Sequence, residues 1–196
     1  MKTTQKNSFK PVFAIVCLLF CFSRVCPGQE TATPKNMITA GANFFYSANA
    51  DFRQIYGQAV FMPEIKITRL VSRNIFIWGS CAFIAKNGFI EEVDEKAKIH
   101  RTMLCIGVGY AHKFSASLRL RGELGFTSIS FKEEALGGTF KGSGLGWKIG
   151  TNLDYFIGKR MFVTLTAAYS GASDEAETGK IRLGGVHAGL CLGFTF

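Results

Sequence analysis

The feature that most constrains this 196-residue chain is an alternation of apolar residues with small or polar residues, which recurs in many segments. The last segment shows it best, because every second position is apolar: Val186, Ala188, Leu190, Leu192, Phe194 and Phe196. The positions between them carry small or polar side chains: His187, Gly189, Cys191, Gly193 and Thr195. Successive residues of a β-strand point to opposite faces, so the pattern predicts a strand with one apolar face.

The same two-sided pattern occurs upstream, and together the segments predict eight strands: roughly 37–47, 57–69, 74–85, 99–112, 116–131, 144–157, 160–171 and 181–196. The sidedness of residues 75–84 stays open, because either Phe76 and Trp78 or Ile75 and Ile77 could face outward. No segment after residue 28 has the approximately 18 consecutive apolar residues of a transmembrane helix.

The connections between these segments alternate in length. Those at 70–73, 113–115 and 158–159 are short, whereas longer polar and often acidic stretches lie near 48–56, 86–98, 132–143 and 172–180. Short turns at one end and long loops at the other are typical of a barrel that crosses a membrane. We therefore expect an all-β fold: one eight-stranded antiparallel up-and-down transmembrane β-barrel with both ends of the chain at the short-turn end.

Charged residues on the face opposite the apolar one decide which face lies inside. We expect these charges in the barrel interior: Glu64, Lys66, Arg119, Arg121, Glu123, Lys148 and Asp154. The interior of a barrel of about eight strands is narrow and filled by side chains, so charges of both signs would pair there. The apolar face then needs a non-aqueous surrounding, and a closed barrel satisfies every backbone group within lipid. Membrane lipid is therefore an expected partner.

Aromatic residues lie near the predicted ends of the apolar bands. We expect five of them to form belts at the membrane interfaces: Tyr46, Tyr110, Trp147, Tyr155 and Tyr169. A secreted soluble ligand-binding barrel is the alternative, and it would bury these aromatic residues in its core.

The first 28 residues have the composition of a signal peptide. Lys2, Lys6 and Lys10 precede the apolar run 12–22, and small Gly28 marks a plausible cleavage point. We therefore divide the chain into a signal peptide (1–28), a short segment (29–36) and a barrel domain (37–196). Cys26 would permit lipidation, but Val25 stands before it where a small residue is expected.

Charge and cysteine content exclude several classes of function. Removing the four basic residues of 1–28 lowers the formal net charge from +9 to +5, and the remaining basic residues are scattered, so no nucleic-acid partner is expected. Processing would also remove Cys17, Cys21 and Cys26. Cys81, Cys105 and Cys191 remain, and an odd number without C-x-x-C spacing predicts neither a disulfide framework nor a zinc site. We expect no cofactor.

Over residues 37–196 the chain resembles the small eight-stranded outer-membrane barrels of the OmpA, OmpX and opacity-protein type. The ending is the most specific point of likeness: Ala188, Leu190, Leu192, Phe194 and Phe196. In that family such an ending is the assembly signal read by the barrel-insertion machinery. The resemblance implies a bacterial outer-membrane location, both termini in the periplasm, the assembly machinery as a partner during biogenesis, and a monomer.

Catalytic residues were sought because some barrels of this size are enzymes. Lipid A deacylases of this architecture carry an H-x-S arrangement, but His187 is followed by Ala188 and Gly189. His100 is followed by Arg101 and Thr102, and His112 lies at a predicted turn. No complete catalytic set is found, so we expect a non-enzymatic protein with an envelope-structural or surface-interaction role through its long loops. The alternatives are a lipid-modifying enzyme, a narrow pore and a secreted soluble barrel.

Overall fold

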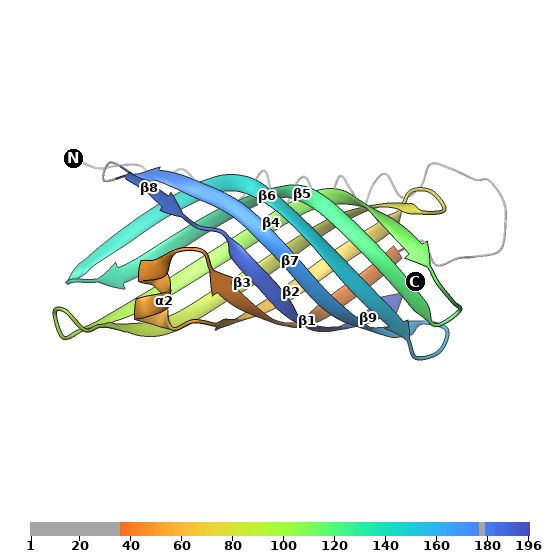
Figure 1. Cartoon of the computed structure of the whole chain (residues 1–196), viewed down its shortest axis with the longest axis horizontal. Coiled ribbons are helices and arrows are strands. Elements are labelled where there is room, and N and C mark those ends of the chain that lie inside the picture. The colour runs from red at the N-terminus through yellow and green to blue at the C-terminus, as the bar shows by residue number, and fades with distance from the viewer. Residues whose placement is uncertain (1–35, 177–178) are drawn as a thin grey trace. The chain divides into compact units, whose positions relative to one another are not determined.

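The computed structural model describes residues 36–176 and 179–196, and these residues form a closed antiparallel β-barrel (Figure 1). The predicted eight-stranded barrel is confirmed. Its described strands are β1 (Asn36–Ser47), β2 (Val60–Leu70), β3 (Ile75–Ile90), β4 (Glu95–Lys113), β5 (Leu118–Ala135), β6 (Gly138–Phe156), β7 (Met161–Ala176), β8 (Gly179–Arg182) and β9 (Gly185–Thr195). A short helix, α2 (Ala50–Tyr56), lies between β1 and β2.

The barrel closes because the first strand pairs with the last. Neighbouring strands pair in chain order from β1 to β7, β7 pairs with β9, and β9 pairs with β1. β8 and β9 both pair with β7 and are separated by Leu183 and Gly184, so together they occupy one of the eight positions in the ring. Closure removes the free sheet edges that a hydrocarbon environment would not tolerate.

The two ends of the barrel differ in their connections. One end, which we call the turn end, carries the short turns 71–74, 114–117 and 157–160 and both ends of the described chain. There the Asn36 N–H donates to the Phe196 carbonyl oxygen at 3.2 Å. The other end, which we call the hairpin end, carries α2 and the tips of the β3–β4 and β5–β6 hairpins (Figure 1). Leu136 and Gly137 connect β5 to β6 with positive φ at both residues, as a two-residue type I′ turn requires.

The expectation of long loops at 86–98 and 132–143 is wrong, because the strands continue through these stretches. β3 and β4 pair as far as Ile90 and Glu95, and β5 and β6 pair as far as Ala135 and Gly138. Polar residues such as Lys132 lie on these strands at positions exposed to water, although Ala97 and Ala135 in the same stretches are buried, so the apolar alternation is interrupted. Near 172–180, β7 likewise extends to Ala176 and β8 begins at Gly179.

The stretch near 48–56 is also more ordered than expected, because it contains α2. The Asn49 side chain caps the helix by accepting the Phe52 N–H at 3.1 Å. Asparagine is among the preferred residues at this position, since it satisfies a backbone donor at the helix start.

Opposite faces of the strands differ as the alternation predicts, and the structure settles residues 75–84. Phe126 and Leu145 are 78% and 80% exposed on the outer face, whereas Phe76 and Trp78 point into the barrel and Ile75 faces outward. Phe76 and Trp78 pair with Gly109 and Gly107 on β4. Glycines opposite large rings leave room for those rings in the interior, and this cross-strand matching is not visible within 75–84 alone.

Other expectations concern the N-terminal segment, cysteines and metals. The predicted signal peptide and Cys17, Cys21 and Cys26 lie outside the described residues. Within 36–176 and 179–196, Cys81, Cys105 and Cys191 are free thiols, and no cluster of potential metal ligands occurs. No helix in this part of the chain is long and apolar enough to cross a bilayer.

Candidate functional site: the charged interior and the mouth of the barrel

An ion-pair cluster centred on Asp154 fills the interior toward the turn end. Arg121 donates from Nε to Asp154 Oδ2 and from Nη2 to Oδ1, both at 2.8 Å, in a bidentate pair. Arg119 donates from Nε to Oδ2 at 2.9 Å, and the Thr164 hydroxyl donates to Oδ1 at 2.8 Å. The Asp154 carboxylate, which is fully buried, therefore receives donors from two neighbouring strands, β5 and β7.

A second layer of buried ion pairs crosses the middle of the barrel. Lys66 Nζ donates to both oxygens of Glu123 at 2.9 Å, and Lys148 Nζ donates to Glu64 Oε1 at 2.9 Å. Both lysine Nζ atoms lie over the Trp78 ring, 5.4 and 5.5 Å from its centroid. Two asparagines complete the layer by donating to the carboxylates, Asn43 to Glu64 and Asn152 to Glu123.

The structure places all seven charged residues expected inside the barrel in these two layers. Six of them are 4% exposed or less, and the Arg119 side chain is 13% exposed. Burying a charge is costly unless it is paired and hydrogen-bonded, and each carboxylate here meets that requirement. The rings of Phe76, Trp78 and Phe162 are buried in the interior together with these pairs.

A serine–histidine pair that the sequence pattern did not reveal lies nearer the hairpin end. Ser170 Oγ and His187 Nε2 are 2.9 Å apart, because β7 and β9 are neighbours and Ser170 pairs with Gly185. The Phe45 ring packs edge-on against the imidazole. Both residues are 1% exposed or less, and His187 Nδ1 has no hydrogen-bond partner in the described chain. Among the side chains that the structure describes, the pair thus lacks an orienting acid, and both of its members are shielded from solvent.

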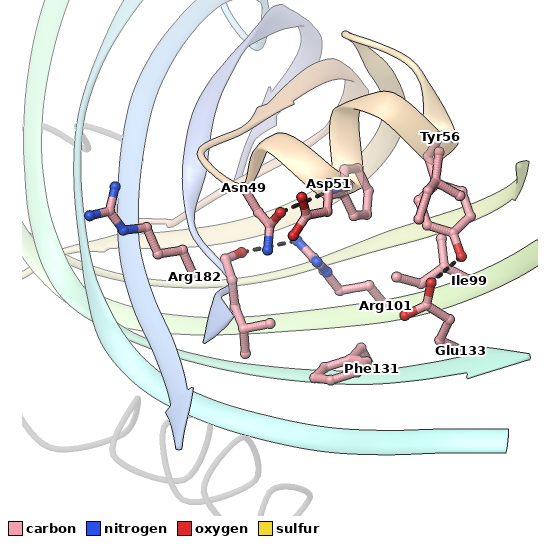
Figure 2. A pocket seen from close by; sticks show the side chains of 11 residues that line it. Asn49, Asp51, Tyr56, Ile99, Arg101, Phe131, Glu133 and Arg182 are labelled. Atoms are coloured by element: carbon pink, nitrogen blue, oxygen red, sulfur yellow. Dashed lines mark hydrogen bonds between the residues drawn. The ribbon is translucent and has the colours of Figure 1, made fainter. Parts of the chain in front are cut away.

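Helix α2 lies across the mouth of the barrel at the hairpin end. Phe52 and Tyr56 of this helix are buried in the apolar core. The Tyr56 hydroxyl donates to Glu133 Oε1 at 2.5 Å, as Figure 2 shows, and Arg53 donates to the Ser47 carbonyl oxygen at 2.6 Å. Burial and the Glu133 carboxylate both raise the pKa of Tyr56, so the phenol remains protonated and keeps donating. These contacts anchor a short helix that would be unstable alone.

A cavity of about 210 Å³ lies beneath α2, and Arg101 is the charged residue buried in its wall (Figure 2). Arg101 Nη1 donates to the Leu183 carbonyl oxygen at 2.9 Å, and the guanidinium lies over the rings of Phe45 and Phe52. Sequence reasoning considered Arg101 only as the neighbour of His100. Arg101 lies two residues after Ile99 on β4, and both side chains face inward. This spacing was the signal in the sequence that could have placed Arg101 in the interior.

The outer face carries the remaining predicted residues. The five expected belt aromatics are all exposed there, and Trp147 and Tyr169 pack together with ring centroids 5.3 Å apart. The five residues of the expected assembly signal also face outward along β9 and at the C-terminal residue. They form a continuous apolar strip, and its proposed recognition by assembly machinery stays a prediction.

Comparison with known proteins shows the fold. Neisserial surface protein A has a TM-score of 0.63 at 9% identity, over 85% of this chain and all of that one. OprG, an outer-membrane protein from Pseudomonas aeruginosa, has a TM-score of 0.61 at 13% identity, over 83% and 96%. Ail, the attachment invasion locus protein of Yersinia pestis, has a TM-score of 0.57 at 15% identity, over 84% and 100%. No protein-family model and no curated protein sequence matches.

These similarities show that the chain has the fold of small eight-stranded outer-membrane barrels, as the sequence predicted. At identities this low they concern the fold, and the chemistry of the chain must be argued from its own residues.

Proposed function

We propose that the chain is a non-enzymatic bacterial outer-membrane barrel that binds an extended segment of a partner protein at the exposed edge of β6. The turn end would face the periplasm and the hairpin end the outside of the cell. The observation that carries the proposal is the difference in length between the two pairings of β6.

The outer face supports a membrane location. Large apolar side chains cover it on every strand of the ring, for example Phe61, Ile106, Phe126 and Leu165. A soluble protein rarely exposes a contiguous apolar surface of this extent. Charged side chains fill the interior instead, which is the arrangement of transmembrane barrels.

The edge of β6 supports the interaction role. β6 pairs with β5 up to Gly138, but its pairing with β7 ends at Leu145. Residues 138–143 therefore have no strand partner on their second side among the described residues. The unpaired stretch of β3 beyond Ala82 has α2 beside it at one point, where the backbone oxygen of Ile55 lies against Gly88. An open edge of this kind is a template for an added strand.

The backbone geometry identifies which groups face the open side. The Phe156 N–H donates to Ser117 beside β5, and the register from there to Gly138 has no bulge. Hydrogen-bonding direction alternates along a strand, so the N–H groups of Thr139, Lys141 and Ser143 point away from β5. The exposed Phe140 ring supplies apolar surface beside this row of donors.

The filled interior supports a binding role over a pore or an enzyme. The two ion-pair layers and the rings between them occupy the space through which ions would pass. The buried Ser170–His187 pair is the closest approach to catalytic chemistry among the described residues, and both side chains are out of reach of a substrate.

A pair of substitutions at Lys141 tests strand addition. Peptides selected from a displayed library on the detergent-purified barrel are measured against the wild type, Lys141→Ala and Lys141→Pro. Alanine keeps the edge N–H, so affinity is retained, whereas proline removes it and lowers affinity about tenfold or more. Equal binding to both variants, with folding verified, contradicts addition at this edge.

A further inference from the structure

Arg101 is the exception among the buried charges of the barrel. Each buried carboxylate of the two ion-pair layers already holds a cation, whereas Arg101 forms no salt bridge with any residue whose side chain the structure describes. The side chain is nevertheless only 4% exposed. A buried charge without a partner is strongly destabilising, so its presence needs a physical reason.

The contacts of Arg101 satisfy only part of the guanidinium. Nη1 donates to the Leu183 carbonyl oxygen at 2.9 Å, and Nε has no hydrogen-bond partner. The rings of Phe45 and Phe52 lie 5.5 and 4.7 Å away, which is attractive for a cation but supplies no acceptor. The Arg101 guanidinium is thus held by one hydrogen bond and by two aromatic rings, and its Nε–H has no acceptor.

The cavity beside Arg101 has the size of a small organic molecule. Its volume is about 210 Å³, and Phe52, Ile55, Ile99 and Phe131 supply apolar walls. An apolar cavity of about 150 Å³ is large enough to hold benzene. Exposed Asp51 also lines the cavity, so the space reaches solvent at its rim.

The charges around the cavity favour an anionic guest. Glu133 accepts the Tyr56 hydroxyl and acts on Arg101 through space, without a direct ion pair, and Asp51 is exposed to water. The buried charge in the lining that lacks a direct ion pair is therefore positive, and the exposed cation Arg182 also lines the cavity. We propose that this cavity binds a small carboxylate with an apolar or aromatic body, whose carboxylate is held by Arg101 and whose body packs against Phe52 and Phe131.

Benzoate is a suitable probe, and benzamide is its neutral counterpart of the same size. The full-length processed protein in detergent micelles is titrated with each compound and followed by NMR. Benzoate is expected to shift the Arg101 Nε resonance and the amides of Phe52 and Leu183, and benzamide to leave them in place. Shifts confined to other parts of the barrel, no binding of benzoate, or equal binding of benzamide would overturn the proposal.

Two substitutions separate the role of Arg101 from general charge. Arg101→Met keeps the length and removes the donors, so we expect benzoate affinity to fall about tenfold or more. Lys98→Met removes an exposed charge from the same strand and should leave affinity unchanged. If Arg101→Met does not fold, Arg101→Lys keeps a charge but fewer donors and should bind more weakly than wild type. Unchanged benzoate affinity in the folded Arg101 variant refutes the assignment.

Discussion

Gly193 of β9 lies directly opposite Phe162 of β7, and the ring occupies the space that a side chain at residue 193 would need. A Cβ atom added to Gly193 would lie 2.2 Å from Cζ of Phe162, and its two other nearest atoms belong to the same ring. The pair illustrates how this barrel is packed: large rings enter the narrow interior where the neighbouring strand carries glycine.

Replacing this glycine should therefore destabilise the barrel. We expect Gly193→Ala to lower the free energy of unfolding by about 1–3 kcal/mol, because Phe162 must leave its packed position. Urea unfolding of the refolded protein in micelles measures the change. Gly122→Ala is the matched control, since nothing lies within 4 Å of its added Cβ atom and it should be near neutral. Equal stability of both variants would show that Phe162 does not fill this space.

The mid-barrel ion pairs should be more sensitive to one substitution than to two. Lys148→Met leaves Glu64 buried without its Nζ partner and should cost about 3–5 kcal/mol. Adding Glu64→Gln removes the stranded charge and should recover part of that loss. Unfolding midpoints of Lys148→Met, Glu64→Gln and the double variant measure the coupling. If the loss of stability in the double variant equals the sum of the two single losses, the residues do not interact as described.

The attachment of α2 should depend on the Tyr56 hydroxyl. Tyr56→Phe removes the donor to the Glu133 carboxylate, and we expect hydrogen exchange within residues 50–56 to become about tenfold faster. Tyr155→Phe, at an exposed phenol on the outer face, serves as the control and should change nothing there. Exchange in α2 that is the same in both variants would show that the Tyr56 hydroxyl does not anchor the helix.

Cysteine labelling should reveal which end of the barrel faces outward. A cysteine placed at Leu136, in the exposed β5–β6 turn, should react with a membrane-impermeant maleimide on intact cells. A cysteine at exposed Ser115, in a turn at the other end, should react only after the membrane is opened. Cys81, Cys105 and Cys191 are first replaced by serine or alanine. The reverse pattern would place the turn end outside and refute the proposed orientation.

Much of the fold could be predicted because an eight-stranded barrel imposes period two on every strand that crosses the lipid. The alternation around Arg121, Glu123 and Lys148 assigns these side chains to the interior without any knowledge of pairing. The hairpin extensions could not be seen in the same way, because exposed polar residues interrupt the apolar alternation there. Residues such as Lys132 and Glu134 therefore have the composition of a loop although they lie in a strand.

The mouth of the barrel was less predictable, because its contacts join residues that are remote in sequence. Tyr56 meets Glu133 only after α2 has folded across the opening, and Ser170 meets His187 only through the pairing of β7 with β9. Register between strands determines the second contact, and period two alone does not specify register. Period two could place the Arg101 side chain on the inner face. That it forms no salt bridge there could be found only from the positions of the other strands.

The chain forms a closed barrel, and we propose that its apolar face contacts membrane lipid. Cell fractionation followed by gel electrophoresis in SDS, with and without boiling, tests this most directly. We predict recovery in the outer-membrane fraction and a change in mobility on boiling, because the closed hydrogen-bonded ring resists SDS until it is heated. A protein that is soluble without detergent and shows the same mobility in both samples would contradict the claim.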